Sequence, residues 1–233
     1  TGNYVIEPRR IELDWLRVFA FLVLVFYHIG MLYVQGWGFH YKSDYQSPTL
    51  ASVMLLVNPW RMPLLWFISG VATRYLLAKL GLVKFIAKRS VTLLLPLTFG
   101  VLVIVPPQLY VEMQAAQVID LNYWQFYQLF LFSDDAIFTQ YQSGIWPHID
   151  VNHLWYLREL WQFTLLVLLF YPLSYLRYVH ITFASFYRLP IFVVVVLLSS
   201  VVLVIELWFA QPREAIGLVF FLFGISVAWH EKF

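Results

Sequence analysis

The chain has 233 residues, of which 61% are hydrophobic, 20% are aromatic and only 12% are charged. With a mean hydropathy of +0.73, this composition is typical of an integral membrane protein. The small net charge of +2 argues against a nucleic-acid partner, and the absence of cysteine excludes disulfides and thiolate chemistry. We therefore expect an all-α, polytopic transmembrane helix bundle.

Residues 13–33, LDWLRVFAFLVLVFYHIGMLY, are long enough to cross a bilayer and contain Asp14, Arg17 and His28. Ionisable groups at membrane depth are costly, so we look for function here first. Arg17 and His28 are eleven residues apart. On a helix this spacing places them within about 20° of one face and about 16 Å apart along the axis. A plainer interpretation stays open, in which Asp14 and Arg17 flank the span and His28 hydrogen-bonds a neighbouring helix.

Six apolar segments predict about six spans, and prolines interrupt two of them. The second segment is longer than one crossing requires. Pro59 and Pro63 predict a short interfacial helix, a break and then a span. Pro106 and Pro107 predict a late break in the third span. The expected spans are approximately 13–33, 63–80, 91–111, 153–175, 190–210 and 215–229.

The segment 112–152 contains acidic residues but neither lysine nor arginine. Within it, residues 123–132, YWQFYQLFLF, are apolar and aromatic but too short to span. We expect this stretch to lie along the membrane interface or to plug the mouth of the bundle.

Lysine and arginine gather on one side of the predicted spans. Counted on alternate sides, nine basic residues lie on one side, and only Lys42 and Arg213 lie on the other. The positive-inside rule then places the N-terminus and the loop 79–89 in the cytoplasm, and the segment 112–152 outside it. The nine are Arg9, Arg10, Lys79, Lys84, Lys88, Arg89, Arg177, Arg188 and Lys232.

An inner polar layer and an outer one follow from this orientation. The inner layer can hold an anionic cytosolic ligand, although orientation alone also requires basic cytoplasmic loops. In the outer layer, His28 and Glu159 have the chemistry of a general base and an orienting carboxylate, and Arg158 and Arg61 are expected at a similar depth. Arg158 and Glu159 should point about 100° apart, so only one of them need face His28. The inner layer comprises Arg17, Arg74, Lys88 and Arg89.

Four sequence motifs carry a resemblance to the membrane acyltransferase 3 family, and they come in family order up to about residue 157. The first is an arginine, ten residues and a histidine, which Arg17 and His28 match. The others are RMPLLWFISG at 61–70, RSVTLLLPLTFG at 89–100 and HLWYL at 153–157. Ser69, Gly70, His153 and Trp155 are the motif residues that we expect to have structural roles, with Ser69 and Gly70 allowing helices to approach closely.

The chain departs from the family pattern in three ways. Leu65 and Trp66 stand where two phenylalanines are usual, and Thr92 stands where a second arginine is expected. The family usually has about ten spans, so the resemblance implies that several helices are missing. The chain also begins with Thr1, and we expect residues 1–233 to be a single transmembrane domain that is incomplete at its C-terminal end.

The resemblance implies transfer of an acyl group, acetyl or succinyl, from cytoplasmic acyl-CoA to a hydroxyl of a glycan or another small acceptor at the outer face. The membrane would be the bacterial inner membrane. Arg17, Arg74, Lys88 and Arg89 would hold the donor. His28 would act as the base or as a transient acyl carrier, with Asp14, Arg17 and Glu159 as further catalytic candidates, and no metal is expected.

Two other classes of function stay open at this stage. One is a proton-coupled transporter, for which we find no convincing internal repeat. The other is a non-catalytic membrane subunit. Contacts with membrane lipid and assembly into a homo-oligomer are compatible with either class and with the enzyme.

Overall fold

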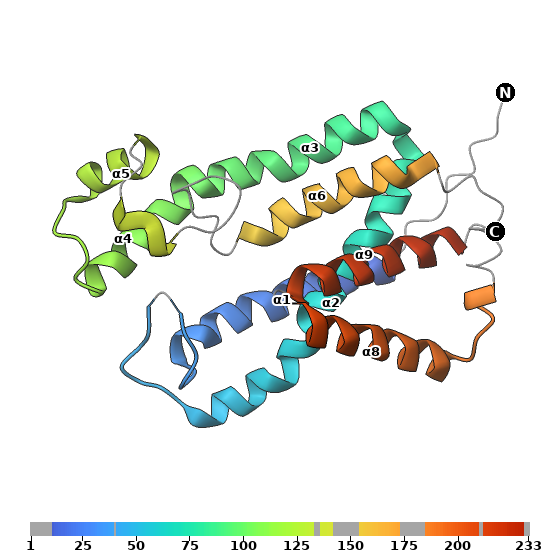
Figure 1. The fold of residues 1–233 in the computed structure, drawn as a ribbon, viewed down its shortest axis with the longest axis horizontal. Coiled ribbons are helices and arrows are strands. Elements are labelled where there is room, and N and C mark those ends of the chain that lie inside the picture. The colour runs from blue at the N-terminus through green and yellow to red at the C-terminus, as the bar shows by residue number, and fades with distance from the viewer. Residues whose placement is uncertain are drawn as a thin grey trace. The chain divides into compact units, whose positions relative to one another are not determined.

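The computed structural model describes residues 11–39, 41–132, 136–141, 154–172, 185–209 and 212–230. Within these ranges the chain is helical, apart from turns, short connections and one parallel β-bridge between Val34 and Ser47 (Figure 1). The expected all-α class is confirmed. The elements are α1 Ile11–Tyr33, α2 Pro48–Leu80, α3 Leu82–Phe99, the π-helical turn η1 Gly100–Ile104, α4 Val105–Ala115, α5 Tyr123–Phe132, the 3-10 turn η2 Ala136–Tyr141, α6 Trp155–Phe170, α8 Ile191–Trp208 and α9 Pro212–His230.

Five helical segments in the described part of the chain are long and apolar enough to cross a membrane. Their exposed surfaces are strongly apolar. On α1, for example, Trp15 is 69% exposed and Phe26 is 68% exposed. Such surfaces are stable only against lipid or further protein, so the protein is an integral membrane protein. The five segments are Ile11–Tyr33, Pro48–Leu80, Leu82–Ala115, Ile191–Trp208 and Pro212–Trp229.

The chain forms two compact units. The first comprises Thr1–Gly36, Tyr45–Arg74 and Leu197–Phe233, and so contains α1, most of α2 and α9. The second comprises Trp37–Asp44 and Tyr75–Val196, and so contains α3 to α6.

In the first unit, small residues bring helices close together. A Cβ added at Gly30 of α1 would lie 3.0 Å from the Met54 sulfur of α2. One at Gly217 of α9 would lie 2.7 Å from the Trp66 indole nitrogen. Residues later in α2 contact residues later in α9: Trp66 lies against Gly217 near the beginning of α9, and Arg74 lies against Trp229 near its end. α2 and α9 therefore run parallel.

Helix direction bears on the number of crossings. α1 and α2 run antiparallel, since Tyr27 lies beside Asn58 while Gly30 meets Met54. The beginning of α1 and the end of α9 therefore lie at the same end of the first unit, as an even number of crossings between them would give. In the second unit α6, with 16 residues, packs antiparallel to α3 and supplies a segment at the place where the sequence predicts the fourth span.

The break expected between Pro59 and Pro63 is wrong, because α2 is one continuous helix of 33 residues. Each proline removes one backbone N–H, yet the helix continues through both. α1 packs against α2 on both sides of Pro59, at Met54 and at Arg61, and this packing favours a single axis. A helix of this length measures about 50 Å, so α2 extends beyond the hydrocarbon core of about 30 Å.

The prolines of the third span also leave the chain helical, through a local change of winding. The turn η1 at Gly100–Ile104 is a π-helix and leads directly into α4, which contains Pro106 and Pro107. Pro106 has no N–H for the Leu102 carbonyl, and the Tyr127 hydroxyl donates to that oxygen at 3.1 Å instead. A side chain from α5 thus compensates for a hydrogen bond that proline removes.

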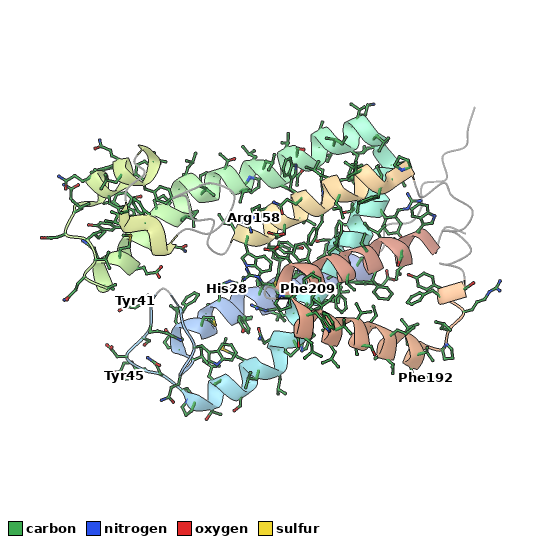
Figure 2. The ribbon with its side chains drawn as sticks, in the orientation of Figure 1. His28, Tyr41, Tyr45, Arg158, Phe192 and Phe209 are labelled. Carbon is green, nitrogen blue, oxygen red and sulfur yellow. The ribbon has the colours of Figure 1, made fainter. Side chains whose placement is uncertain are left out.

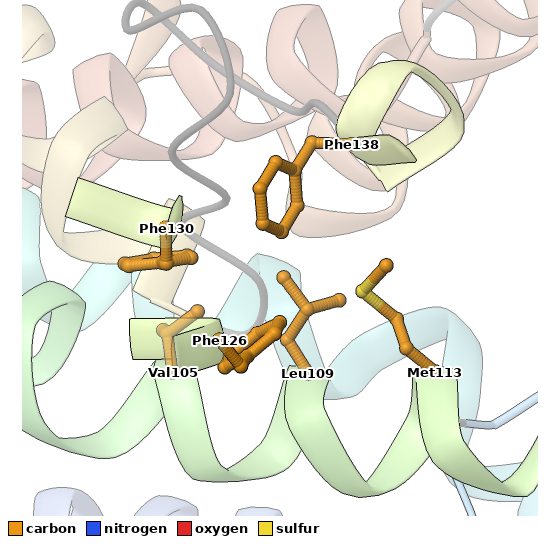
Figure 3. Packing of buried hydrophobic residues seen from close by; sticks show 6 residues of the cluster. All are labelled: Val105, Leu109, Met113, Phe126, Phe130 and Phe138. Atoms are coloured by element: carbon orange, nitrogen blue, oxygen red, sulfur yellow. The ribbon is translucent and has the colours of Figure 1, made fainter. Parts of the chain in front are cut away.

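α5 is a helix over the residues where an interfacial helix is predicted, and it packs on α4 through an aromatic cluster (Figure 3). Figure 3 shows the Phe138 ring directed from η2 toward Leu109. Trp124 on the outer surface of α5 is 72% exposed, as suits a membrane interface. The cluster comprises Val105, Leu109, Met113, Phe126, Phe130 and Phe138.

Beside the cluster, burial raises the pKa of the Tyr123 hydroxyl, and Tyr127 raises it by a smaller amount. Both effects favour the neutral phenol.

Candidate active site on the first helix

His28 lies in the last third of α1 and is half-buried (Figure 2). Its Nδ1 is 2.8 Å from the backbone carbonyl oxygen of Leu24, one turn earlier. A carbonyl oxygen only accepts hydrogen bonds, so Nδ1 carries the proton and donates. In the neutral ring this arrangement leaves the lone pair on Nε2, which is the atom that can take a proton from a substrate.

Arg17 is paired on its own helix. Its Nη1 lies 3.5 Å from Asp14 Oδ1, three residues earlier, and the two side chains are 41% and 34% exposed. Exposed pairs of this kind contribute about 0 to 1 kcal/mol, so a competing phosphate can displace the carboxylate at little cost. The guanidinium therefore has a resting partner without being permanently occupied.

Tyr27, next to His28, is at the centre of a polar contact between α1 and α2. Its hydroxyl donates to Asn58 Oδ1 at 2.9 Å, and the Arg61 guanidinium carbon lies 3.5 Å from the centroid of its ring. Arg61 Nη2 also donates to Asn58 Oδ1, at 3.4 Å. Arg61 thus lies at the level of the residue that precedes His28, and its place in an outer polar layer stays a prediction.

Arg74 lies two turns before the end of α2, and its guanidinium carbon is 4.6 Å from the ring centroid of Trp229 on α9. Its Nε is shielded from solvent and has no hydrogen-bond acceptor among the described residues. The cation–π contact stabilises the charge without neutralising it. Arg74 therefore has a ring, and not a carboxylate, as its partner among the described residues.

Lys88 and Arg89 lie on α3 in the second unit. Lys88 is exposed, whereas Arg89 Nε donates to Thr164 Oγ1 of α6 at 3.4 Å. Beside this contact, Trp161 Nε1 donates to the Ser90 hydroxyl at 3.2 Å. Thr92, which replaces an arginine of the family pattern, donates its hydroxyl to the Lys88 carbonyl at 2.7 Å and so satisfies itself within α3.

Glu159 on α6 is 3% exposed and pairs with its neighbour Arg158, whose place on the helix Figure 2 shows. Arg158 Nη2 and Nε donate to Glu159 Oε1 at 2.7 and 3.2 Å. Although consecutive residues on a helix point about 100° apart, the long arginine side chain bends back to the carboxylate, a pairing that the sequence analysis did not predict. The expected partnership of Glu159 with His28 stays a prediction, since the two residues belong to different units.

A sequence-family comparison adds independent information to this geometry. The family model for the acyltransferase domain of type 3 matches residues 10–233. The chain belongs to the acyltransferase 3 family. No curated protein and no solved structure matches it.

The protein is therefore a membrane acyltransferase, and the arginine, ten residues and histidine on α1 are part of the matched region. Gly70 of its second motif lies where α2 crosses α9, and an added Cβ there would overlap the Phe221 carbonyl oxygen. Next to it, Ser69 accepts a hydrogen bond at its carbonyl from the Thr73 hydroxyl at 2.7 Å. Trp155 is the first residue of α6, and His153 lies outside the described residues.

The structure distributes the predicted site residues of this acyltransferase over both units. The first unit holds Asp14, Arg17, His28 and Arg74, and the second holds Lys88, Arg89 and Glu159. A single donor site built from all four basic residues therefore stays a prediction. No group of three or more histidine, aspartate or glutamate side chains in the described ranges is arranged to hold a metal.

Tyr27, Asn58 and Trp229 were missed from the sequence. The first two have a detectable signal, because Asn58 and Arg61 are three residues apart on one helical face and Tyr27 precedes the motif histidine. Trp229 has none. Tryptophan in a membrane protein indicates an interfacial position first, and only the packing of α9 on α2 places Trp229 against Arg74.

Proposed function

We propose that this acyltransferase moves an acetyl or succinyl group from cytoplasmic acyl-CoA to a hydroxyl of a glycan or another small acceptor at the outer membrane face. The bacterial inner membrane is the setting that fits an acyl-CoA donor on one side and a glycan on the other. Family membership supports acyl transfer, and the arrangement of α1 supports the division between a donor side and an acceptor side.

The observation that carries the proposal is the bond from His28 Nδ1 to the Leu24 carbonyl, at 2.8 Å. It orients the ring and assigns the proton to Nδ1, so that in the neutral ring Nε2 carries the lone pair that a base requires. The bond is to a backbone oxygen of the same helix, so it fixes the orientation of the ring relative to α1.

In the proposed reaction, Nε2 of His28 takes the proton of the acceptor hydroxyl as its oxygen attacks the thioester carbonyl. The carbon–sulfur bond breaks, the acyl group stays on the acceptor oxygen, and the CoA thiolate leaves and takes up the proton. A two-step variant, in which Nε2 itself carries the acyl group transiently, uses the same atom.

The donor phosphates would bind about 16 Å away along α1, near Arg17. Arg74 supports this role because its cation–π contact with Trp229 leaves the charge without a carboxylate partner among the described residues. The distribution of lysine and arginine along the sequence predicts that Arg17, Arg74 and Arg89 lie toward the cytoplasmic side. The charge of these residues suits the phosphates of acyl-CoA.

The test compares His28→Asn with His28→Ala in the whole protein in detergent, with acyl-CoA binding and acyl transfer both measured. Asparagine places an amide nitrogen near the position of Nδ1 and can keep the Leu24 hydrogen bond, but it has no group that takes up a proton. Both variants should bind acyl-CoA as the wild type does and lose transfer by about 100-fold or more. Substantial transfer by His28→Asn would show that His28 is structural.

A further inference from the structure

Arg61 is a cation whose hydrogen-bonding capacity is only partly used. One face of its guanidinium lies on the Tyr27 ring, at 3.5 Å, and Nη2 donates to Asn58 Oδ1 at 3.4 Å. The Asn58 contact is long, and the same oxygen accepts a shorter bond of 2.9 Å from the Tyr27 hydroxyl. The neutral residues around Arg61 therefore orient the guanidinium more than they satisfy it.

The Nε of Arg61 is shielded from solvent and has no acceptor in the part of the chain that the structure describes. Within that part, no aspartate or glutamate pairs with Arg61 either. Arginine stays charged at any accessible pH, and a charge at membrane depth is costly until it is paired. The partner that matches Nε together with an Nη is an anion with two oxygens, which both nitrogens can bind at once.

The position of Arg61 along the membrane indicates where such an anion would lie. Arg61 contacts Tyr27, which precedes His28, and so lies at the level of the proposed base in the first unit. The donor phosphates would bind near Arg17, about 16 Å away along the axis of α1, so an anion at Arg61 would lie at a different level from them.

We propose that Arg61, oriented by Tyr27 and Asn58, binds a carboxylate or phosphate group at the level of His28. The anion would belong to a substrate or to a lipid headgroup, and the shared chemistry is an oxyanion with two acceptor oxygens. The site itself does not depend on the role of His28, and only its assignment to a substrate rests on the proposed function.

Two substitutions separate anion binding from a purely structural link between α1 and α2. Arg61→Gln removes the charge and the fork of donors. Asn58→Asp changes one atom of the side chain and places a carboxylate beside Arg61, so the protein supplies its own anion. Arg213→Gln, at the beginning of α9, removes an exposed arginine on the same predicted side and is the matched control.

The experiment measures the thermal unfolding of the full chain in an uncharged detergent at constant ionic strength. The probes are succinate, inorganic phosphate and a short-chain phosphatidylglycerol, and the controls are sodium chloride and succinamide. At about ten times the Kd of a binding probe, the Tm of the wild type and of Arg213→Gln should rise by about 3 to 6 °C. Arg61→Gln and Asn58→Asp should lose this rise, and Asn58→Asp should begin from a higher Tm.

The probe that stabilises the protein identifies the source of the anion. Succinate indicates a substrate carboxylate, inorganic phosphate a substrate phosphate, and phosphatidylglycerol alone a lipid headgroup. The proposal is overturned when no probe raises the wild-type Tm above the controls, or when Asn58→Asp responds like the wild type. Since the readout is binding, loss of the proposed role of His28 would leave this result unaffected.

Discussion

Arg158 donates two hydrogen bonds, at 2.7 and 3.2 Å, to one carboxylate oxygen of Glu159, its neighbour on α6. Consecutive residues on a helix point about 100° apart, so the contact requires the arginine side chain to fold back across the helix surface. Glu159 is 3% exposed, and both charges are largely removed from water. Each charge is thus paired within α6 itself and needs no counter-charge from another helix.

This geometry predicts that removing one partner is worse than removing both. Glu159→Ala should lower the stability of the protein by about 3 to 5 kcal/mol, because it leaves the Arg158 charge buried and unpaired. The double variant Arg158→Met, Glu159→Leu should cost much less. Thermal unfolding in detergent measures both, and equal stability of the single and double variants would contradict the pairing.

A second prediction concerns Gly70, where α2 meets α9. A Cβ at this position would overlap the backbone oxygen of Phe221, which cannot move aside as a side chain can. We expect Gly70→Ala to destabilise the protein by about 1 to 3 kcal/mol. Gly38→Ala is the control, since nothing lies within 4 Å of a Cβ there. Equal Tm values for the two variants would show that α2 and α9 are not in close contact.

The third prediction addresses the donor site. Arg89→Ala should weaken acyl-CoA binding by about 1 to 3 kcal/mol, the range for a charge-assisted hydrogen bond, and by more at low salt than at high salt. Lys84→Ala removes an exposed lysine one turn earlier on α3 and should change affinity less. Isothermal titration in two salt concentrations makes the comparison. If the Arg89→Ala variant bound acyl-CoA with unchanged affinity at both salt concentrations, Arg89 would contribute only to the orientation of the protein in the membrane.

The fourth prediction is the orientation in the membrane. The chain has no cysteine, so single cysteines can be placed cleanly at Asp120 and at Lys84, which are both exposed. In intact cells, Asp120→Cys should react with a membrane-impermeant maleimide, and Lys84→Cys should react only with a permeant one. The reverse pattern would invert the topology and with it the assignment of donor and acceptor sides.

Proline shows where a local rule fails. Pro59 and Pro63 each remove one backbone donor, and the sequence therefore predicts a break in the second span. The structure keeps α2 continuous because α1 packs against it on both sides of Pro59. In the third span, a π-helical turn precedes Pro106, and the Tyr127 hydroxyl donates to the Leu102 carbonyl, so the helix continues there too. Such compensation involves residues distant in sequence, so no local pattern reveals it.

The sequence by itself determined the membrane class, the approximate helix positions and the spacing of Arg17 and His28 along one helix, because hydropathy and the helical repeat are properties of consecutive residues. Tertiary structure alone decided which charges are paired and which are not. Glu159 binds the residue beside it, Arg74 lies over Trp229, and Arg61 lies on Tyr27 with no described residue accepting a hydrogen bond from its Nε. These contacts depend on the conformations of the long side chains and on which helices pack against each other. A cation in the membrane must find a partner, but its sequence position does not say which one.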